Sequence, residues 1–365
     1  MKRSVDNRTE TGKSCPKILG LFQKRIDGDD ALLELGRLRF SQAGLGTEFY
    51  AETPGELEYL LQFRPGVKTP AAVHLSRRLN ILNRDDRSNI ADFAAKAAER
   101  IFGLVVHDQV ETATHQNDYV GALRELDSML QAKNGPLLFI EYASGLDTKL
   151  FVNLFRRIAG LENVSACIDT GHVGIWKTRE VFSKMHPGRD ICGIRTDDPD
   201  LRDLMDDISS SVDRALPETV HVVRELSAIG KPVHLHLHDG HPLSHGGISG
   251  VADHMSFLET IPLPFEFRGK RSVDLMYGLS GLSAILRAAL EFLAPERISL
   301  SLEIHPGNGR IPLEDASCLF DHWRDRTNAE KMNCWLIVLS RNKKLLEEAC
   351  RQFYNNRRQR TDETA

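Results

Sequence analysis

One stretch, residues 232–240 (PVHLHLHDG), constrains the fold of this chain more than any other. Histidine alternates with an aliphatic residue for three repeats, and in a β-strand this period of two places His234, His236 and His238 on one face. The aliphatic residues lie on the opposite face, where they can pack into a core. Since imidazole is the commonest metal ligand, the pattern predicts a strand with one metal-binding face. A polar strand whose histidines are satisfied by hydrogen bonds is the alternative.

Further short runs rich in Val, Ile and Leu also predict strands, and helical patterns lie between them. The predicted strands are residues 17–22, 44–50, 70–75, 103–107, 136–142, 164–169, 232–238 and 298–305. Eight alternating units predict parallel strands joined by right-handed crossovers, which close into a single α/β domain, a (β/α)8 TIM barrel. An open doubly wound sheet is the alternative fold. The turn after its first strand should then be glycine-rich, but QKRIDGDD has no GxGxxG pattern.

The expected domain division is a barrel over residues 17–355, with a flexible N-terminal segment 1–16 and a charged tail 356–365. Thr53 and Asp147 each precede a helical pattern and are predicted helix starts. Two insertions break the alternation, at residues 173–216 after the sixth strand and 240–273 after the seventh. We expect long loops there that form a lid or a pocket wall, because substrate loops of a barrel follow the carboxyl ends of its strands.

Composition bounds the possible partners. Hydrophobic residues make up 41% of the chain and charged residues 27%, which is typical of a globular protein with a sizeable core. A net charge of -4 argues against a surface built wholly to bind a polyanion. The six cysteines form no CxxC pair, and no apolar run suits a secretory signal or a membrane span. The sequence therefore predicts a cytoplasmic protein with free thiols and no membrane partner; it predicts no oligomeric state.

Ionisable residues gather at the ends of the predicted strands. Carboxylates in runs as apolar as LLFIE and LSLEI cost several kcal/mol unless something offsets their desolvation, and a divalent cation would do so. Each residue alone could be a hydrogen-bonded core group, half of an ion pair or a turn cap. Together, at one end of successive strands, they predict a metal site. The candidates are His74, His107, Glu141, Asp169, His172, His236, His238, Asp239, His254, Glu303 and His305.

This ordered set, with DTGH at 169–172, HLHD at 236–239 and LEIH at 302–305, resembles the xylose isomerase-like barrel superfamily. That superfamily includes sugar isomerases and epimerases and the endonuclease IV-type apurinic-site (AP) nucleases, and the resemblance runs from about residue 17 to about residue 310. It implies a central metal held by Glu141, Asp169, His236 and Glu303. The nuclease branch adds a second ion on residues matching His74 and His107, with Glu141 bridging, and a third on residues matching His172 and His254.

The chain departs from the nuclease pattern in the seventh loop. The nuclease triplet there is DxH, whereas here Ala252 takes the first place, Asp253 the second and His254 the third. The turn with glycine and glutamate that usually follows is replaced by MSFLETIPLPF. These departures speak against a third ion and leave a site for one or two divalent ions, with Mn, Zn, Mg or Co as candidates.

The favoured hypothesis is a sugar or sugar-phosphate isomerase or epimerase. Its metal would stabilise an enediolate. Resemblance to the epimerase branch implies that Glu141 and Glu303 are the catalytic groups, one removing a proton and the other returning it. His238, Asp239 and His305 are predicted to contact this small sugar-type substrate. Ala252 and the negative net charge support this choice over nucleic acid as a partner.

Two alternatives remain. The first is an endonuclease IV-like zinc phosphodiesterase, favoured by His74 and His107. Its phosphate contacts could come from Arg77, Arg78 and a group of cations in the first insertion, although that group could equally be a solvated face balanced by the acidic run 196–207. The cations are Lys177, Arg179, Lys184, Arg189 and Arg195. The second alternative is a barrel that binds a ligand without catalysis.

Overall fold

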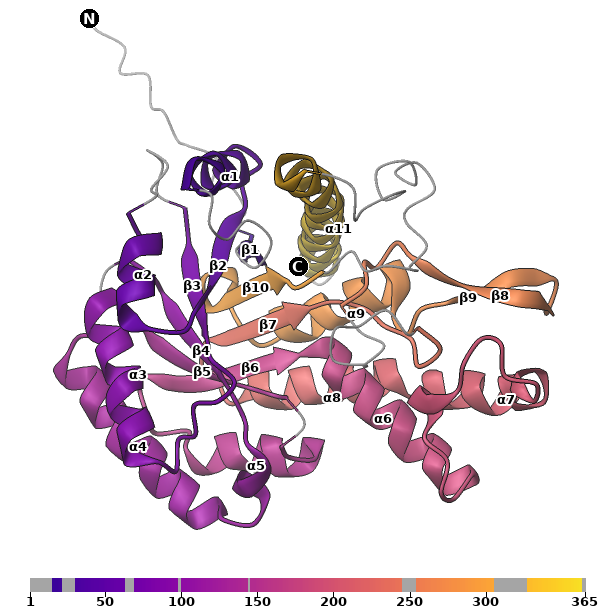
Figure 1. Ribbon diagram of the computed structural model, residues 1–365, viewed down its shortest axis with the longest axis horizontal. Helices are drawn as coiled ribbons and strands as arrows, with labels where there is room; N and C mark the ends of the chain where they lie inside the picture. The colour runs from indigo at the N-terminus through magenta and orange to yellow at the C-terminus, as the bar shows by residue number, and fades with distance from the viewer. Residues whose placement is uncertain are drawn as a thin grey trace, which may run out of the picture.

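Eight parallel strands close into a barrel in sequence order (Figure 1). The computed structural model describes residues 15–21, 30–62, 69–97, 100–143, 145–244, 254–304 and 327–362. The barrel strands are β1 (Lys17–Leu21), β2 (Gly46–Ala51), β3 (Ala71–Leu75), β4 (Gly103–His107), β5 (Leu137–Glu141), β6 (Val164–Asp169), β7 (Val233–Leu237) and β10 (Ile298–Leu302). β1 pairs in parallel with both β2 and β10, which closes the ring. The predicted TIM barrel is confirmed.

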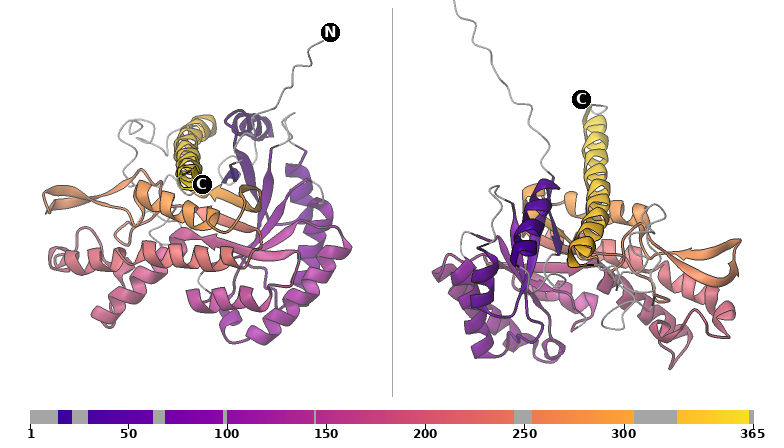
Figure 2. Two further views of the ribbon diagram at one scale, coloured as in Figure 1. Left: turned by 180° about the vertical axis from the view of Figure 1, so that it is seen from behind. Right: turned by 45° about the horizontal axis from the view of Figure 1, so that its top comes forward.

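Helices form the outer layer of the barrel (Figures 1 and 2). Thr53 and Asp147 cap α2 and α5, as predicted, by accepting hydrogen bonds from the backbone N–H groups of Glu56 and Leu150. The α-helices of this layer are α1 (Asp30–Gln42), α2 (Pro54–Leu60), α3 (Arg84–Ala97), α4 (Gln116–Ala132), α5 (Thr148–Arg157), α6 (Thr170–Met185), α8 (Ala215–Ala228), α9 (Gly278–Leu290) and α11 (Asn328–Asp362).

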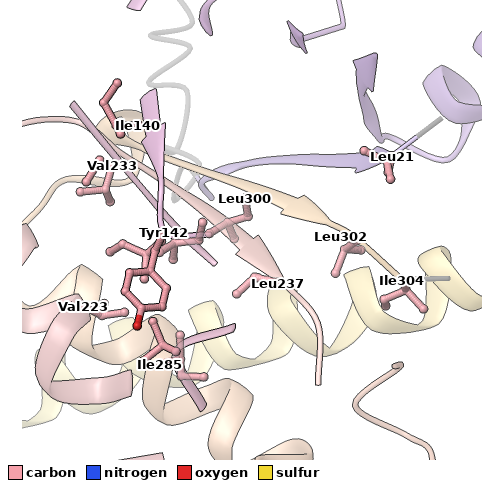
Figure 3. Close-up of a cluster of buried hydrophobic side chains, with 14 of the residues drawn as sticks. Leu21, Ile140, Tyr142, Val223, Val233, Leu237, Ile285, Leu300, Leu302 and Ile304 are labelled. Atoms are coloured by element: carbon pink, nitrogen blue, oxygen red, sulfur yellow. The ribbon is translucent and has the colours of Figure 1, made fainter. Parts of the chain in front are cut away.

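The alternation in β7 divides its side chains between two environments. Val233, Leu235 and Leu237 are buried in the main apolar cluster between strands and helices. Figure 3 shows Val233 and Leu237 in that cluster together with Leu300 of β10 and Ile285 of α9. Burying each such side chain contributes about 1.5–3 kcal/mol. The histidines of β7 take the other face, toward the barrel interior, so the core holds the strand in the register that assembles the site.

The two insertions lie where the sequence predicts them, but much of each is regular structure rather than loop. α7 (Leu201–Val212) follows α6, and the second insertion contains the antiparallel hairpin of β8 (Thr260–Phe267) and β9 (Lys270–Asp274). Both project from the same side of the barrel (Figure 1). Arg202 of α7 lies over the Phe265 ring at 4.8 Å, and Arg268 forms an ion pair with Asp206 at 2.6 Å. These two side-chain contacts link the hairpin to α7.

α11, the last helix, packs against α9 and β10 (Figure 2). Trp335 Nε1 donates a hydrogen bond to the carbonyl oxygen of Ile304 at 2.8 Å. The charged residues 356–362 continue this helix, while the division into segment, barrel and tail stays a prediction. Within the described ranges, no helix combines the length and apolar character that a membrane crossing requires.

Candidate metal centre

The carboxyl ends of four barrel strands bring the predicted central ligands together. Glu141 ends β5, Asp169 ends β6, His236 lies in β7 and Glu303 follows β10. One ligand atom from each lies within 4.8 Å of the others, and the four side chains are 0–5% exposed. His236 Nδ1 lies 3.1 Å from Glu141 Oε1 and 3.0 Å from Glu303 Oε2. This is a buried carboxylate and imidazole shell of the kind that holds Mn, Zn or Co.

The polar atoms of this group fit a divalent cation. Glu141 Oε2, Asp169 Oδ2 and Glu303 Oε2 are buried and accept no hydrogen bond from any described residue. Glu303 Oε2 lies close to His236 Nδ1, but the alignment is not that of a hydrogen bond. Buried oxygen atoms are seldom left in this state, because each unsatisfied one costs free energy. Three of the four ligand residues therefore have a buried oxygen that a cation could satisfy.

A second ligand set shares Glu141 with the first. His74 Nε2 lies 2.9 Å and His107 Nε2 3.2 Å from Glu141 Oε2, and ligand atoms of the three residues lie within 4.8 Å of one another. His74 Nδ1 lies 3.0 Å from the carbonyl oxygen of Leu75, which can only accept a hydrogen bond. His74 therefore donates from Nδ1, and Nε2 is the nitrogen that it turns toward Glu141, as a metal ligand with an outer partner does.

The third cluster, His172, His238 and His254, also gathers its nitrogens within 4.8 Å. The backbone N–H of His254 donates to His238 Nδ1 at 2.8 Å, so His238 must carry its proton on Nε2, which lies 2.9 Å from Asp169 Oδ1. Both nitrogens of His238 are thus engaged by the protein. The structure brings the predicted His172 and His254 together, whereas Ala252 and Asp253 lie outside the described residues.

The residues of the DTGH motif stabilise the start of α6 as well as contributing to the candidate metal centre. Asp169 Oδ1 accepts a hydrogen bond from the backbone N–H of His172 at 2.7 Å and so caps α6. A Cβ atom on Gly171 would lie 2.0 Å from Cε1 of His238. Only glycine leaves room for the ring that holds Asp169, and Asp169 Oδ2 remains directed to the metal centre.

His254 adopts an uncommon backbone conformation. Its φ is +60°, in the left-handed region that residues with a Cβ atom seldom occupy. Its ring stacks on that of His238, with centroids 4.3 Å apart and an interplanar angle of 3°, and its Nε2 lies 3.5 Å from Glu303 Oε1. Strain of this kind persists where surrounding contacts hold it, and here those contacts belong to the metal centre.

Sequence reasoning missed two residues of β2. Glu48 is fully buried and contacts His234 Nε2 and His236 Nε2, each at 2.9 Å. Tyr50 donates from its hydroxyl group to Glu303 Oε1 at 3.0 Å. Glu48 and Tyr50 are two positions apart in the strand GTEFYA and so share its inner face. A carboxylate in so apolar a strand was the available signal, the same one that identified Glu141.

Opposite charges set the ionisation of the centre. Burial by itself raises the pKa of Glu141, but His107, His236 and His74 outweigh burial, and this pKa lies well below its usual range. Burial likewise raises the pKa of Glu303, but the charge and hydrogen bond of His236 outweigh burial, and this pKa also lies well below its usual range. Both glutamates are therefore anionic at neutral pH, which is the form that binds a cation.

The predicted substrate contacts are differently placed. Asp239 is buried and accepts hydrogen bonds from the backbone N–H groups of Gly240, Tyr277 and Gly278 at 2.7–3.3 Å. Burial raises its pKa to about 7. Its contacts, like those of His238, are with protein groups at the rim of the barrel. His305 lies outside the described residues, and a substrate-binding role for these three residues stays a prediction.

Solvent reaches the centre from one side. The His107, His172 and His254 side chains are 23%, 22% and 18% exposed, whereas those of the central four ligands are nearly closed off. Among the described ligand candidates, these three histidines are therefore the ones that solvent reaches.

The cations of the first insertion are engaged locally. Each forms an ion pair with a nearby carboxylate, at 2.6–3.1 Å. The pairs are Lys177–Glu180, Arg179–Asp190, Lys184–Glu180, Arg189–Asp200 and Arg195–Asp197. Such pairs form a solvated, charge-balanced face and not an open phosphate-binding surface. Arg77 and Arg78, by contrast, lie exposed in the turn after β3.

Comparison with known proteins finds only distant structural similarity. No protein-family model matches the chain, and no curated protein matches it. Among solved structures, a xylose isomerase domain protein from Planctomyces limnophilus is similar over 92% of this chain and 99% of its own, with 11% identity and a TM-score of 0.46. The carboxyl transferase domain of Rhizobium etli pyruvate carboxylase is similar over 90% of this chain and 49% of its own, with 12% identity and a TM-score of 0.33.

Proposed function

We propose that this protein is a divalent-metal enzyme whose centre holds two ions bridged by Glu141. One observation carries the proposal: the set of His74, His107 and Glu141 and the set of Glu141, Asp169, His236 and Glu303 meet at a single carboxylate. His74 already presents the nitrogen that a ligand needs, and oxygens of three carboxylates accept no hydrogen bond from the described residues.

Hydrolysis of a phosphate ester is the reaction that this geometry favours. When bound, two neighbouring divalent ions lower the pKa of water and stabilise charge on a phosphoryl group. In this proposal His74 and His107 hold one ion and Asp169, His236 and Glu303 the other, while Tyr50 fixes the orientation of Glu303. A mononuclear isomerase does not require His74 and His107. Because both contact Glu141, they favour the hydrolytic alternative.

The substrate is proposed to be small and anionic. The cations of the first insertion are already paired with carboxylates, which removes the main basic surface that a polynucleotide would use. Arg77 and Arg78 follow His74 by only a few residues at the same rim of the barrel, where a guanidinium group can contact a phosphate.

Sugar isomerisation or epimerisation remains the second candidate. Glu141 Oε1 and Glu303 Oε2 both lie about 3 Å from His236 Nδ1, so two carboxylates converge on one point. In that reaction one glutamate removes a proton from carbon and the other returns it. This reaction does not require His74 and His107, which lie beside Glu141, and this places the isomerase second.

Metal content and two assays separate the candidates. Elemental analysis of the purified protein should give two ions per chain, and bis(p-nitrophenyl) phosphate should be hydrolysed by the metal-loaded enzyme. An isomerase would instead incorporate solvent deuterium into an aldose or ketose, with one ion per chain. A protein that binds no divalent ion would overturn both candidates.

A further inference from the structure

A carboxylate and a histidine lie beneath the metal centre and outside both ligand sets. Glu48 of β2 and His234 of β7 are 0% exposed. His234 packs on the Phe139 ring with centroids 5.3 Å apart, within the small apolar cluster of Val105, Phe139 and Cys167. A charged group in such surroundings is costly unless every polar atom has a partner.

The contacts form one chain from β10 to the metal centre. Glu48 Oε1 contacts His236 Nε2 and Glu48 Oε2 contacts His234 Nε2, each at 2.9 Å. His234 Nδ1 lies 2.7 Å from the hydroxyl oxygen of Ser299. A carboxylate accepts, so both Nε2 atoms carry hydrogen and His234 Nδ1 accepts from Ser299. Every polar atom of Glu48 and His234 is then satisfied.

These hydrogen bonds exclude a metal site at the same residues. Ligand atoms of Cys167, His234 and His236 lie within 4.8 Å of one another, a spacing that could hold a metal ion. His234, however, has one nitrogen on Glu48 and the other on Ser299. It has no lone pair left for a cation, so these residues support the centre above them.

The orientation of the His236 ring follows from Glu48. With Nε2–H donated to Glu48, Nδ1 is the nitrogen that faces Glu141 and Glu303. Histidine ligands generally depend on such an outer partner, which fixes the ring and decides which nitrogen meets the metal. A ring turned by 180° would lose both sets of contacts.

We propose that Glu48 is a positioning residue that presents Nδ1 of His236 to the metal, with His234 and Ser299 holding Glu48 in place. This inference depends on the proposed metal centre but not on the reaction it catalyses. Glutamine at position 48 is not equivalent, because its amide nitrogen would face the N–H of one histidine.

The test is a cobalt titration of the metal-free full-length protein, in competition with a chromophoric chelator. E48Q should weaken the tighter Co²⁺ site by roughly 10- to 100-fold, the range typical for loss of an outer partner, and should change the visible spectrum of bound Co²⁺. S299A acts at the far end of the chain and should give a smaller loss in the same direction. D127N is the matched control, since Asp127 is a buried carboxylate of α4 bonded to Asn163 and Gln131.

The outcomes are distinct. Loss of affinity in E48Q and S299A, with D127N unchanged, supports the inference. Wild-type affinity in a folded E48Q, or wild-type affinity in S299A where E48Q fails to fold, overturns it and leaves the proposed centre intact. An equal loss of Co²⁺ affinity in D127N would show that the loss reflects lower stability in general, and this outcome also overturns the inference. Failure of the wild-type protein to bind Co²⁺ overturns the proposed function together with the inference.

Discussion

A single carboxylate, Glu141, has three histidine neighbours: His74, His107 and His236. Groups that share a partner act as a unit, so substitutions among them are expected to be strongly non-additive. Once one ligand is lost, removal of a second should cost far less than it does in the wild-type protein. The loss of activity or metal affinity in any one variant therefore measures disruption of the whole group of side chains and not the contribution of one residue.

Glu303→Gln should abolish turnover while the fold is preserved. Glutamine keeps the size of the side chain and can still accept from Tyr50, but the negative charge beside His236 is lost. Turnover, metal content and circular dichroism are the measurements. Glu125→Gln, whose half-exposed side chain pairs with the buried Arg87, is the control and should remain fully active. Unchanged activity in the Glu303 variant would rule out its role in the centre.

Tyr50→Phe removes one hydrogen bond and keeps the ring that packs on His74 at 4.7 Å. We expect a loss of about 0.5–1.5 kcal/mol in the free energy of unfolding and a weaker hold on the metal, because Glu303 loses its orienting donor. Urea unfolding and Co²⁺ affinity test this. Wild-type metal affinity would mean that Tyr50 supports packing alone.

At the scale of elements, the carboxyl end of β6 and the start of α6 are built around Gly171. Asp169 caps the helix, and His238 of the neighbouring strand end fills the space that a Cβ atom would take. The cap and a proposed metal ligand are therefore one residue, and the helix cannot shift without moving Asp169.

Gly171→Ala should displace the His238 ring and weaken metal binding. The clash at 2.0 Å involves a buried ring, and overpacking of this kind costs about 1–3 kcal/mol. Gly121→Ala is the matched control, because nothing lies within 4 Å of its added Cβ in the middle of α4. That change should raise stability by about 0.5–1 kcal/mol. Equal metal affinity in the two variants would contradict the packing argument.

Elements were predictable where one physical signal dominated. The apolar runs gave every barrel strand to within a few residues, and Thr53 and Asp147 marked helix starts through their capping side chains. α7 and the hairpin of β8 and β9 were expected as loops, because their polar residues masked helical spacing in LRDLMDDISSSV and alternation in TIPLPFEF. α7 packs against α6, and the two hairpin strands pair with each other, through contacts that no local pattern contains.

For the whole molecule, the eight strand ends converge as the sequence predicts, and this convergence gathers His74, His107, Glu141, Asp169, His236 and Glu303. The contributions of Glu48 and Tyr50 could not be inferred with the same ease. Their partners, His236 and Glu303, lie 188 and 253 residues away along the chain. Pairings of that separation depend on closure of the barrel and leave little trace in local sequence.

The stability of the metal-free molecule should depend on pH through Asp239. Its pKa is raised from 3.8 to about 7 in the folded protein, mainly by burial. The folded state therefore holds a proton more tightly than the unfolded state, so the stabilisation is complete below pH 3.8 and is lost as the pH rises through about 7.

Urea unfolding of the metal-free wild-type protein and of Asp239→Asn, between about pH 5 and pH 8, measures this effect. The free energy of unfolding should fall more steeply with pH in the wild-type protein than in the variant, which cannot titrate at this position. Parallel curves would show that the carboxyl group stays ionised throughout and that its three backbone donors outweigh burial.

The pairing of β1 with β10 has a consequence for synthesis in the cell. One edge of β1 finds its hydrogen-bond partner only when residues 298–302 have been made. At roughly 5–20 residues per second, the ribosome needs tens of seconds to travel from one strand to the other. Throughout that interval the nascent chain carries an open strand edge, which is a template for association with other chains. Protection during translation is therefore a requirement that this topology imposes.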